Sequence, residues 1–384
     1  MPRDVPVSGL CLPDFYEVEE LFKRNMSKGD PSCGDEVGAC VSIVIEGETV
    51  VDLWGGYKDA ARKQLWEKNT ITCMMSVTKA CAAICLLTLV DRGIVDIEKP
   101  VSYYWPDFGK NGKENISILT LISHKSGVIY ADAAPAGSLW QDGIVEKALE
   151  DEVPQWTPGT AGSYHSFTYG PLISGLIRHV DGRSVGQFWR DEISSRFNLD
   201  FNIGLDEEEA LRCAEFIETP GTPSRDGIKV NTESPLFRAW NPMPKEEDFN
   251  SENWLKNEFA SANGHGNARA IASLFGGLAN YGKIDGKQLL SKDIINLAIS
   301  EHWNELDRMT NRHFRFGCGF MLSCPPFPFG GKQDNFGHTG IGGAVGFGDP
   351  HKRMGFSYCC NRMAPIADLG PFATPMIESV YRSI

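Results

Sequence analysis

The feature that most constrains the fold is the apolar stretch from Ala80 to Val90. Almost every residue in it is apolar, so a helix formed there has no side that suits water and must pass through the protein core. Gly93 follows closely, and glycine is the residue that most often ends a helix. The chain has 384 residues, which is long enough to surround such a helix with a large core.

Two reactive side chains, Ser76 and Lys79, stand at the start of this predicted helix. A spacing of three places them on one helical face, within reach of a shared proton. The unpaired N–H groups of a helix N-terminus also favour a developing negative charge. The pattern Ser-x-x-Lys is common, and the alternative is a helix cap with a lysine that faces solvent. This one is the only such pattern in the sequence, and a lysine beside a buried helix is costly without a partner.

Composition limits the classes of partner. The formal net charge of −13 argues against nucleic acid and against anionic membranes, since both need a basic surface. No apolar run reaches the ~20 residues of a membrane span, and the first residues lack a signal-peptide pattern. Eleven cysteines without a C-x-x-C pattern indicate buried, reduced thiols. We therefore expect a soluble, cytoplasmic protein.

Strand patterns lie near both ends of the chain. An N-terminal helix is predicted from Phe15 to Met26, and a hairpin from Ala39 to Trp54 with its turn at Glu46-Gly47. Three C-terminal strands and a last helix are predicted at Phe314 to Leu322, Gly337 to Phe347, Met354 to Cys360 and Ile366 to Tyr381.

Helical spacing dominates the middle of the chain. The predicted helices are Ile116 to His124, Leu139 to Glu150, Gly170 to Val180, Val185 to Phe197 and Ala268 to Asn280. The stretch from Gly221 to Asn250 is predicted to be a long polar loop that serves as a lid or binding loop. The expected fold class is α+β: an antiparallel sheet formed from both chain ends and flanked by helices, with an inserted all-helical lobe. Residues 1–105 plus 283–384 would form the sheet lobe and residues 106–282 the mostly helical lobe of one domain, with a site in the cleft between them.

Two further stretches carry candidate site residues. A tight turn from Trp156 leads into a helix start and holds Tyr164, while glycines surround His338 and Gly340 and allow close approach of another backbone. Together, Ser76-x-x-Lys79, Pro158-Gly-Thr-x-x-x-Tyr164 and His338-Thr-Gly340 resemble the motifs of the serine β-lactamase and penicillin-binding-protein superfamily. The chain is most similar to its class C-related members, the family VIII carboxylesterases, from roughly Val41 to Met363.

The resemblance implies a β-lactamase-like fold and an acyl-enzyme mechanism without cofactor or metal. Ser76 would be the nucleophile, with Lys79 or Tyr164 as the base, a choice that the sequence leaves open. Tyr164 would also pass the proton to the leaving group. Backbone N–H groups of Ser76 and Ile341 would form the oxyanion hole.

Two departures from the antibiotic-hydrolysing pattern bear on specificity. His338 stands where those enzymes carry a lysine that holds the substrate carboxylate, and a histidine is mostly neutral at pH 7. Ser166 stands where they often carry an asparagine. Both departures favour small neutral esters over β-lactams as the substrates. Among the aromatic residues, Trp240 is the one most readily placed in the cleft.

Other histidines are predicted to be structural. His124 and His265 lie in turns, and His165 is expected to face the helical lobe, with the cleft as its alternative. His302 and Glu305 have a spacing suited to metal ligands but lack a second histidine, so we expect no metal.

The leading hypothesis is a serine hydrolase of small neutral carboxylic esters. The alternatives are an amide-directed peptidase or weak β-lactamase with the same residues, a transacylase, and a non-catalytic binding or scaffold protein that retains the fold. The oligomeric state is left open.

Overall fold

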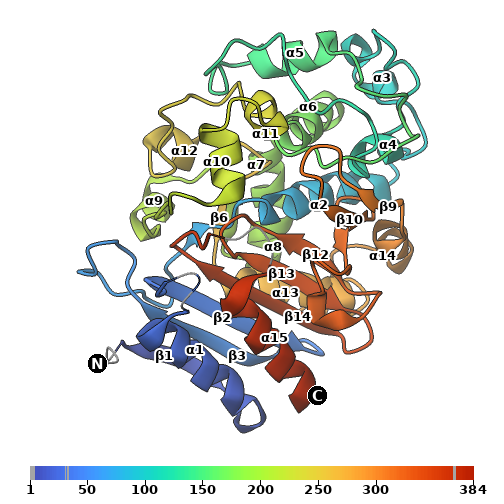
Figure 1. The fold of residues 1–384 in the computed structure, drawn as a ribbon. Helices are drawn as coiled ribbons and strands as arrows, with labels where there is room; N and C mark the ends of the chain where they lie inside the picture. Colours follow the sequence, from blue (N-terminus) through green and yellow to red (C-terminus); the bar gives the residue numbers. More distant parts are fainter. Residues whose placement is uncertain (1–4, 31, 33, 366–368) are drawn as a thin grey trace.

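A nine-stranded antiparallel sheet forms the base of the computed structural model, which describes residues 5–30, 32, 34–365 and 369–384 (Figure 1). Its strand order is β1-β3-β2-β14-β13-β12-β11-β10-β9. The strands are β1 (Val7–Cys11), β2 (Gly38–Ile45), β3 (Glu48–Gly56), β9 (Trp303–Leu306), β10 (His313–Phe316), β11 (Met321–Leu322), β12 (Phe336–Thr339), β13 (Val345–Asp349) and β14 (Met354–Cys360). Strand β2 pairs with β14, so the two chain ends build one sheet, which confirms the predicted α+β architecture.

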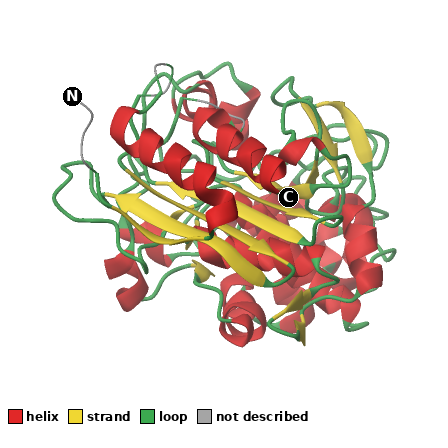
Figure 2. Ribbon diagram, turned by 90° about the horizontal axis from the view of Figure 1, so that it is seen from below, coloured by secondary structure: helices red, strands yellow, loops and turns green. Residues whose placement is uncertain are grey.

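Helices cover both faces of this sheet. Side chains alternate between the faces along a strand. In β2, Val41 and Ile43 share a core with α1 (Tyr16–Lys28) and α15 (Gly370–Ser383), whereas Cys40 packs on the face of α13 (Ala268–Ala279). Figure 2 shows helices crossing one face of the sheet, with further helices behind it. The approach of α13 is close, because a Cβ added at Gly355 would lie 2.0 Å from the carbonyl oxygen of Ala272.

The predicted central helix is α2 (Val77–Asp91). Its residues from Val77 to Leu89 are all buried. The helix contacts α6 (Tyr169–Asp181), α7 (Val185–Trp189) and β12. Lys79 is fully buried, so the alternative of a lysine that faces solvent is excluded. In Figure 1 the helix lies between the sheet and the helical part of the molecule.

Apart from α6, the remaining elements are short. The helices are α3 (Val101–Tyr104), α4 (Ile118–Ile122), α5 (Ile144–Asp151), α6 (Tyr169–Asp181), α7 (Val185–Trp189), α8 (Ser195–Phe197), α9 (Glu207–Arg212), α10 (Pro223–Lys229), α11 (Pro235–Ala239), α12 (Glu252–Lys256) and α14 (Lys292–Ile299), with single helical turns at Pro13–Phe15, Pro106–Phe108, Arg190–Ser194 and Phe329–Gly331. Two small sheets contain β4 (Thr72–Cys73), β5 (Phe201–Ile203) and β6 (Gly264–Gly266), and β7 (Lys283–Ile284) with β8 (Lys287–Gln288). None of the described helices is both long and apolar enough to cross a membrane.

The hairpin prediction is confirmed. Strands β2 and β3 are joined at Glu46 and Gly47, whose φ angles of 54° and 91° are both positive, as a tight two-residue hairpin turn requires. Strand β1, at the sheet edge, was not predicted.

Two strand predictions are wrong in detail. The predicted strand from Phe314 to Leu322 is a hairpin of β10 and β11, with a turn at Gly319, whose φ is 79°. The predicted strand from Gly337 to Phe347 is a hairpin of β12 and β13, with a turn at Gly342 and Gly343, whose φ angles are 94° and 112°. In both cases a glycine that adopts positive φ reverses the chain.

Four other predicted segments differ from the structure in extent or type, or lie partly outside the described residues. The predicted loop from Gly221 to Asn250 contains α10 and α11, and each begins with a proline, a residue that suits the first helical position. The predicted helices at Ile116 to His124 and Leu139 to Glu150 shrink to α4 and α5. The predicted start of the last helix, from Ile366, lies outside the described residues, and α15 begins at Gly370.

Candidate active site

Ser76 lies at the N-terminus of α2, after a short turn that follows β4. Between them, Met75 adopts a positive φ of 45°, which is unusual for a residue with a side chain and is the kind of backbone strain found at functional sites. The turn leaves Ser76 part-exposed at the floor of a cleft.

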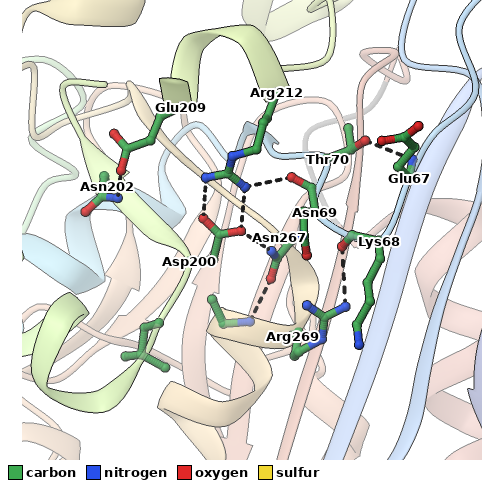
Figure 3. Close-up of polar contacts among 12 residues, drawn as sticks. Glu67, Lys68, Asn69, Thr70, Asp200, Asn202, Glu209, Arg212, Asn267 and Arg269 are labelled. Carbon is green, nitrogen blue, oxygen red and sulfur yellow. Dashed lines mark hydrogen bonds and ion pairs between the residues drawn. The ribbon is translucent and has the colours of Figure 1, made fainter. Parts of the chain in front are cut away.

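A polar network holds the strands that lead to Ser76 (Figure 3). Arg212 pairs with both carboxylate oxygens of Asp200, at 2.9 and 3.0 Å, and donates to the Asn69 carbonyl at 2.7 Å. The Asn267 side chain donates to the same Asp200 carboxylate at 2.9 Å. These contacts tie together the segment before β4, the residue before β5 and the residue after β6, and so fix the small sheet next to the nucleophile.

Lys79 contacts both other candidate catalytic residues. Its Nζ lies 3.2 Å from Ser76 Oγ, within hydrogen-bond distance, and donates to the carbonyl oxygen of Ser261 at 2.7 Å. The same Nζ lies 4.9 Å from the centre of the Tyr164 ring. Burial holds the pKa of Lys79 well below its ordinary value. Among the described residues, no carboxylate lies within ion-pair distance of this amine. The site therefore favours a neutral amine.

Tyr164 lies across the cleft on the loop before α6. Its ring stacks on Phe314 and Phe316, with centroids 5.5 and 6.0 Å away, and its backbone N–H donates to Asp307 Oδ1 at 2.7 Å. Burial raises the pKa of the Tyr164 hydroxyl; contact with the Ser76 hydroxyl lowers it in part, and the charge of Asp307 raises it further. Near neutral pH this phenol keeps its proton.

His338 is buried beside Tyr164, with ring centroids 6.0 Å apart. Its Nδ1 lies 2.7 Å from the Thr339 carbonyl oxygen, which assigns the ring proton to Nδ1. Burial lowers the pKa of His338 to about 3, so the imidazole is neutral.

Gly340 brings the turn after β12 against the strand that leads to Ser76. A Cβ added at Gly340 would lie 2.4 Å from the carbonyl oxygen of Met74. Among the described residues, the backbone N–H groups of Ser76 and Ile341 donate no hydrogen bond, so both are available to a ligand.

The cleft has a volume of about 680 Å³. Six of the residues proposed from sequence line the cleft: Ser76, Tyr164, Ser166, Trp240, His338 and Ile341. Lys79 and Gly340 are not part of the lining. Trp240 Nε1 donates to Ser166 Oγ at 2.8 Å, a contact that the sequence did not indicate.

The other histidines lie outside the cleft lining. His124 Nδ1 accepts from the backbone N–H of His165, and its ring stacks on Tyr169 at 4.3 Å. His165 Nε2 lies 2.6 Å from Ser126 Oγ. Burial lowers the pKa of both rings and of His265. Within the part of the chain that the structure describes, no group of three metal-binding side chains comes together.

A family model described as Beta-lactamase matches residues 24–372. The chain belongs to the beta-lactamase family. It is 29% identical over 336 residues to the Esterase/beta-lactamase LipL of Mycobacterium tuberculosis, which covers 85% of this chain and 77% of that protein.

Solved structures of this family are similar over nearly the whole chain. A penicillin-binding-protein homologue from Caulobacter crescentus is 32% identical, with a TM-score of 0.89, over 99% of this chain and 100% of that one. A family VIII carboxylesterase is 30% identical, with a TM-score of 0.86 and the same coverage. The chain is therefore a serine hydrolase of the beta-lactamase superfamily, and carboxylesterases are among its structural neighbours.

Sequence reasoning missed three charged residues at this site. Asp226 and Arg312 line the cleft, and Asp307 holds the Tyr164 backbone. Asp307 is 143 residues from Tyr164 in sequence, so no local pattern could have linked the two.

Proposed function

We propose that this protein hydrolyses small neutral carboxylic esters through an acyl-enzyme on Ser76. The observation that carries the proposal is the position of Lys79, a fully buried amine that contacts the Ser76 hydroxyl, one backbone carbonyl and the Tyr164 ring. A neutral amine next to a serine hydroxyl is suited to act as its base.

In the proposed acylation, Lys79 takes the proton of Ser76 Oγ as this oxygen attacks the ester carbonyl. The N–H groups of Ser76 and Ile341 hold the resulting oxyanion, and each such donor contributes ~3 kcal/mol in comparable sites. Tyr164 gives its proton to the leaving alkoxide, and the proton on Lys79 then restores the phenol. The raised pKa of Tyr164 supports this role, because a phenol that keeps its proton can donate it.

Deacylation repeats these steps with water as the nucleophile. Tyr164 and Lys79 would activate the water, and Ser76 Oγ would recover its proton. Atoms and charges balance over the cycle without a cofactor or metal.

The preference for neutral esters is supported by the cleft. His338 is neutral and buried, so it offers no permanent cation for a substrate carboxylate at the position beside Tyr164. The cation of Arg312 in the cleft lining is accompanied there by the carboxylate of Asp226. The cleft lining also includes apolar side chains, which suit an acyl chain: Met75, Ile228, Leu236, Met309, Phe314, Met321 and Phe327. The relatives named as an esterase and as a carboxylesterase support the same substrate class.

The proposed division into lobes is compatible with this site. Tyr164, Ser166 and Trp240 come from the proposed lobe of residues 106–282, and Ser76 and His338 from the proposed sheet lobe. The cytoplasmic location stays a prediction.

The test is hydrolysis of p-nitrophenyl acetate, butyrate and octanoate by the wild type and by Ser76→Ala, with nitrocefin as the β-lactam. We expect the wild type to hydrolyse the short esters, Ser76→Ala to lose this activity, and nitrocefin to react slowly. Preferred turnover of nitrocefin would instead establish the β-lactamase alternative suggested by the name of LipL. Equal rates for the wild type and Ser76→Ala on every substrate would support the binding-protein alternative.

A further inference from the structure

The hairpin of β9 and β10 holds the proposed proton donor. Phe314 and Phe316 on β10 stack on the Tyr164 ring at 5.5 and 6.0 Å. Asp307, just after β9, accepts from the Tyr164 backbone N–H at 2.7 Å. Ring and backbone are thus fixed by the same hairpin.

Asp307 is buried, with 2% of its surface exposed. Its two carboxylate oxygens accept hydrogen bonds from different segments of the chain. Oδ1 accepts from Ser163 Oγ and from the Tyr164 N–H, both at 2.7 Å. Oδ2 accepts from the Thr310 N–H at 2.7 Å and from Thr310 Oγ1 at 2.5 Å. Among the described residues, no cation forms an ion pair with it, so N–H and O–H donors alone balance the carboxylate.

The turn held by Oδ2 is part of the cleft wall, since Met309 and Thr310 both line the cleft. The Asp307 carboxylate therefore connects the loop that carries Tyr164 to the cleft wall at Met309 and Thr310. We propose that Asp307 is a positioning residue that holds Tyr164 at the distance from the cleft wall needed to protonate the leaving group. The inference rests on the proposed function, because it requires Tyr164 to be the proton donor.

This role predicts a dependence on the leaving group. p-Nitrophenoxide is a stable anion and leaves without a proton, whereas ethoxide must be protonated as it departs. Loss of a positioned acid therefore slows acylation by an ethyl ester far more than by a p-nitrophenyl ester. A merely structural role would slow both esters by the same factor.

The experiment compares kcat/KM for ethyl butyrate and p-nitrophenyl butyrate, which form the same acyl-enzyme. For Asp307→Ala we expect a loss of about 100-fold on the ethyl ester and less than about tenfold on the p-nitrophenyl ester. Asp307→Asn keeps one acceptor oxygen and should show a smaller loss with the same preference. It also serves as the test if Asp307→Ala does not fold.

Two reference variants make the comparison specific. Tyr164→Phe should show the same leaving-group preference, and adding Asp307→Ala to it should not increase that preference, because both changes remove one function. Glu305→Gln is the matched control: Glu305 lies in the same hairpin and accepts from the Gly162 N–H at 2.8 Å, two residues before Tyr164. It should affect both esters equally.

The outcomes separate the two proposals. If Tyr164→Phe discriminates between the esters and the Asp307 variants do not, the role of Asp307 is refuted and the proposed function stands. If Tyr164→Phe does not discriminate, the proposed proton donor is wrong and the inference is overturned with it. A shared preference that is not additive in the double variant supports both.

Discussion

Replacing Lys79 by methionine should separate catalysis from stability. The variant keeps an unbranched side chain out to the ε position and removes the amine. General bases contribute about 10²–10⁴-fold to rate, so we expect kcat/KM for p-nitrophenyl butyrate to fall by about 1,000-fold, equivalent to about 4 kcal/mol of barrier.

The expected effect of Lys79→Met on stability is small. The Ser261 carbonyl loses its 2.7 Å hydrogen bond, and a buried acceptor left alone costs about 1–3 kcal/mol. The variant also removes an amine whose pKa burial has pushed down, which is a gain in the folded state. The two effects oppose each other, so we expect the free energy of unfolding to change by less than about 2 kcal/mol.

Lys113 provides the matched control. It is also fully buried, and its Nζ donates to the carbonyl oxygens of Glu150 and Glu152. Lys113→Met leaves two buried acceptors alone, so it should lower the melting temperature while kcat changes by less than about twofold. The assay is ester hydrolysis by both variants together with thermal unfolding. Retention of kcat/KM within about tenfold in Lys79→Met would refute Lys79 as the base and transfer that role to Tyr164.

Three further perturbations follow from the site. A Cβ at Gly340 would lie 2.4 Å from the Met74 carbonyl oxygen, so Gly340→Ala should displace the turn that carries the Ile341 N–H and lower kcat about 100-fold. An unchanged kcat would show that the turn can move to accommodate the methyl group. Trp240→Ala removes the indole ring that donates to Ser166 Oγ and enlarges the cleft. The preferred p-nitrophenyl ester should therefore shift from the butyrate towards the octanoate. An unchanged preference would show that the acyl chain binds in another part of the cleft. Burial lowers the pKa of His338 from 6.5 to about 3, so the unfolded state binds more protons in that window and stability falls as pH drops through it. His338→Asn should make the urea midpoint less sensitive to pH between 6.5 and 3, and an unchanged slope would contradict the burial argument.

The parts of the site that could be predicted from sequence are those that local patterns encode. The apolar run after Ala80 and the spacing of Ser76 and Lys79 both depend on residues within a few helical turns of each other. The structure places these side chains 3.2 Å apart, as a shared helical face requires. The pairing of the two chain ends followed from the strand patterns near both termini.

The parts that could not be predicted depend on turns or on distant contacts. Alternating apolar residues predict a strand, but they do not show that Gly343 reverses it, because glycine adopts both signs of φ. Trp240 was assigned to the cleft, yet its bond to Ser166 joins residues 74 positions apart. The carboxylate of Asp307 acts over a still longer separation, and no periodicity reports such contacts.

The pairing of β2 with β14 has a consequence for biosynthesis. Cys40 and Cys359 are neighbours across these strands although 319 positions separate them. During translation the hairpin of β2 and β3 is synthesised early. Its partner strand β14 is synthesised only after most of the chain has been translated. Contacts between residues so far apart in sequence form slowly. Until β14 pairs with it, the edge of β2 is exposed and can pair with other chains. Chaperone binding to this hairpin during synthesis would therefore aid the yield of folded protein more than binding to the helices made later.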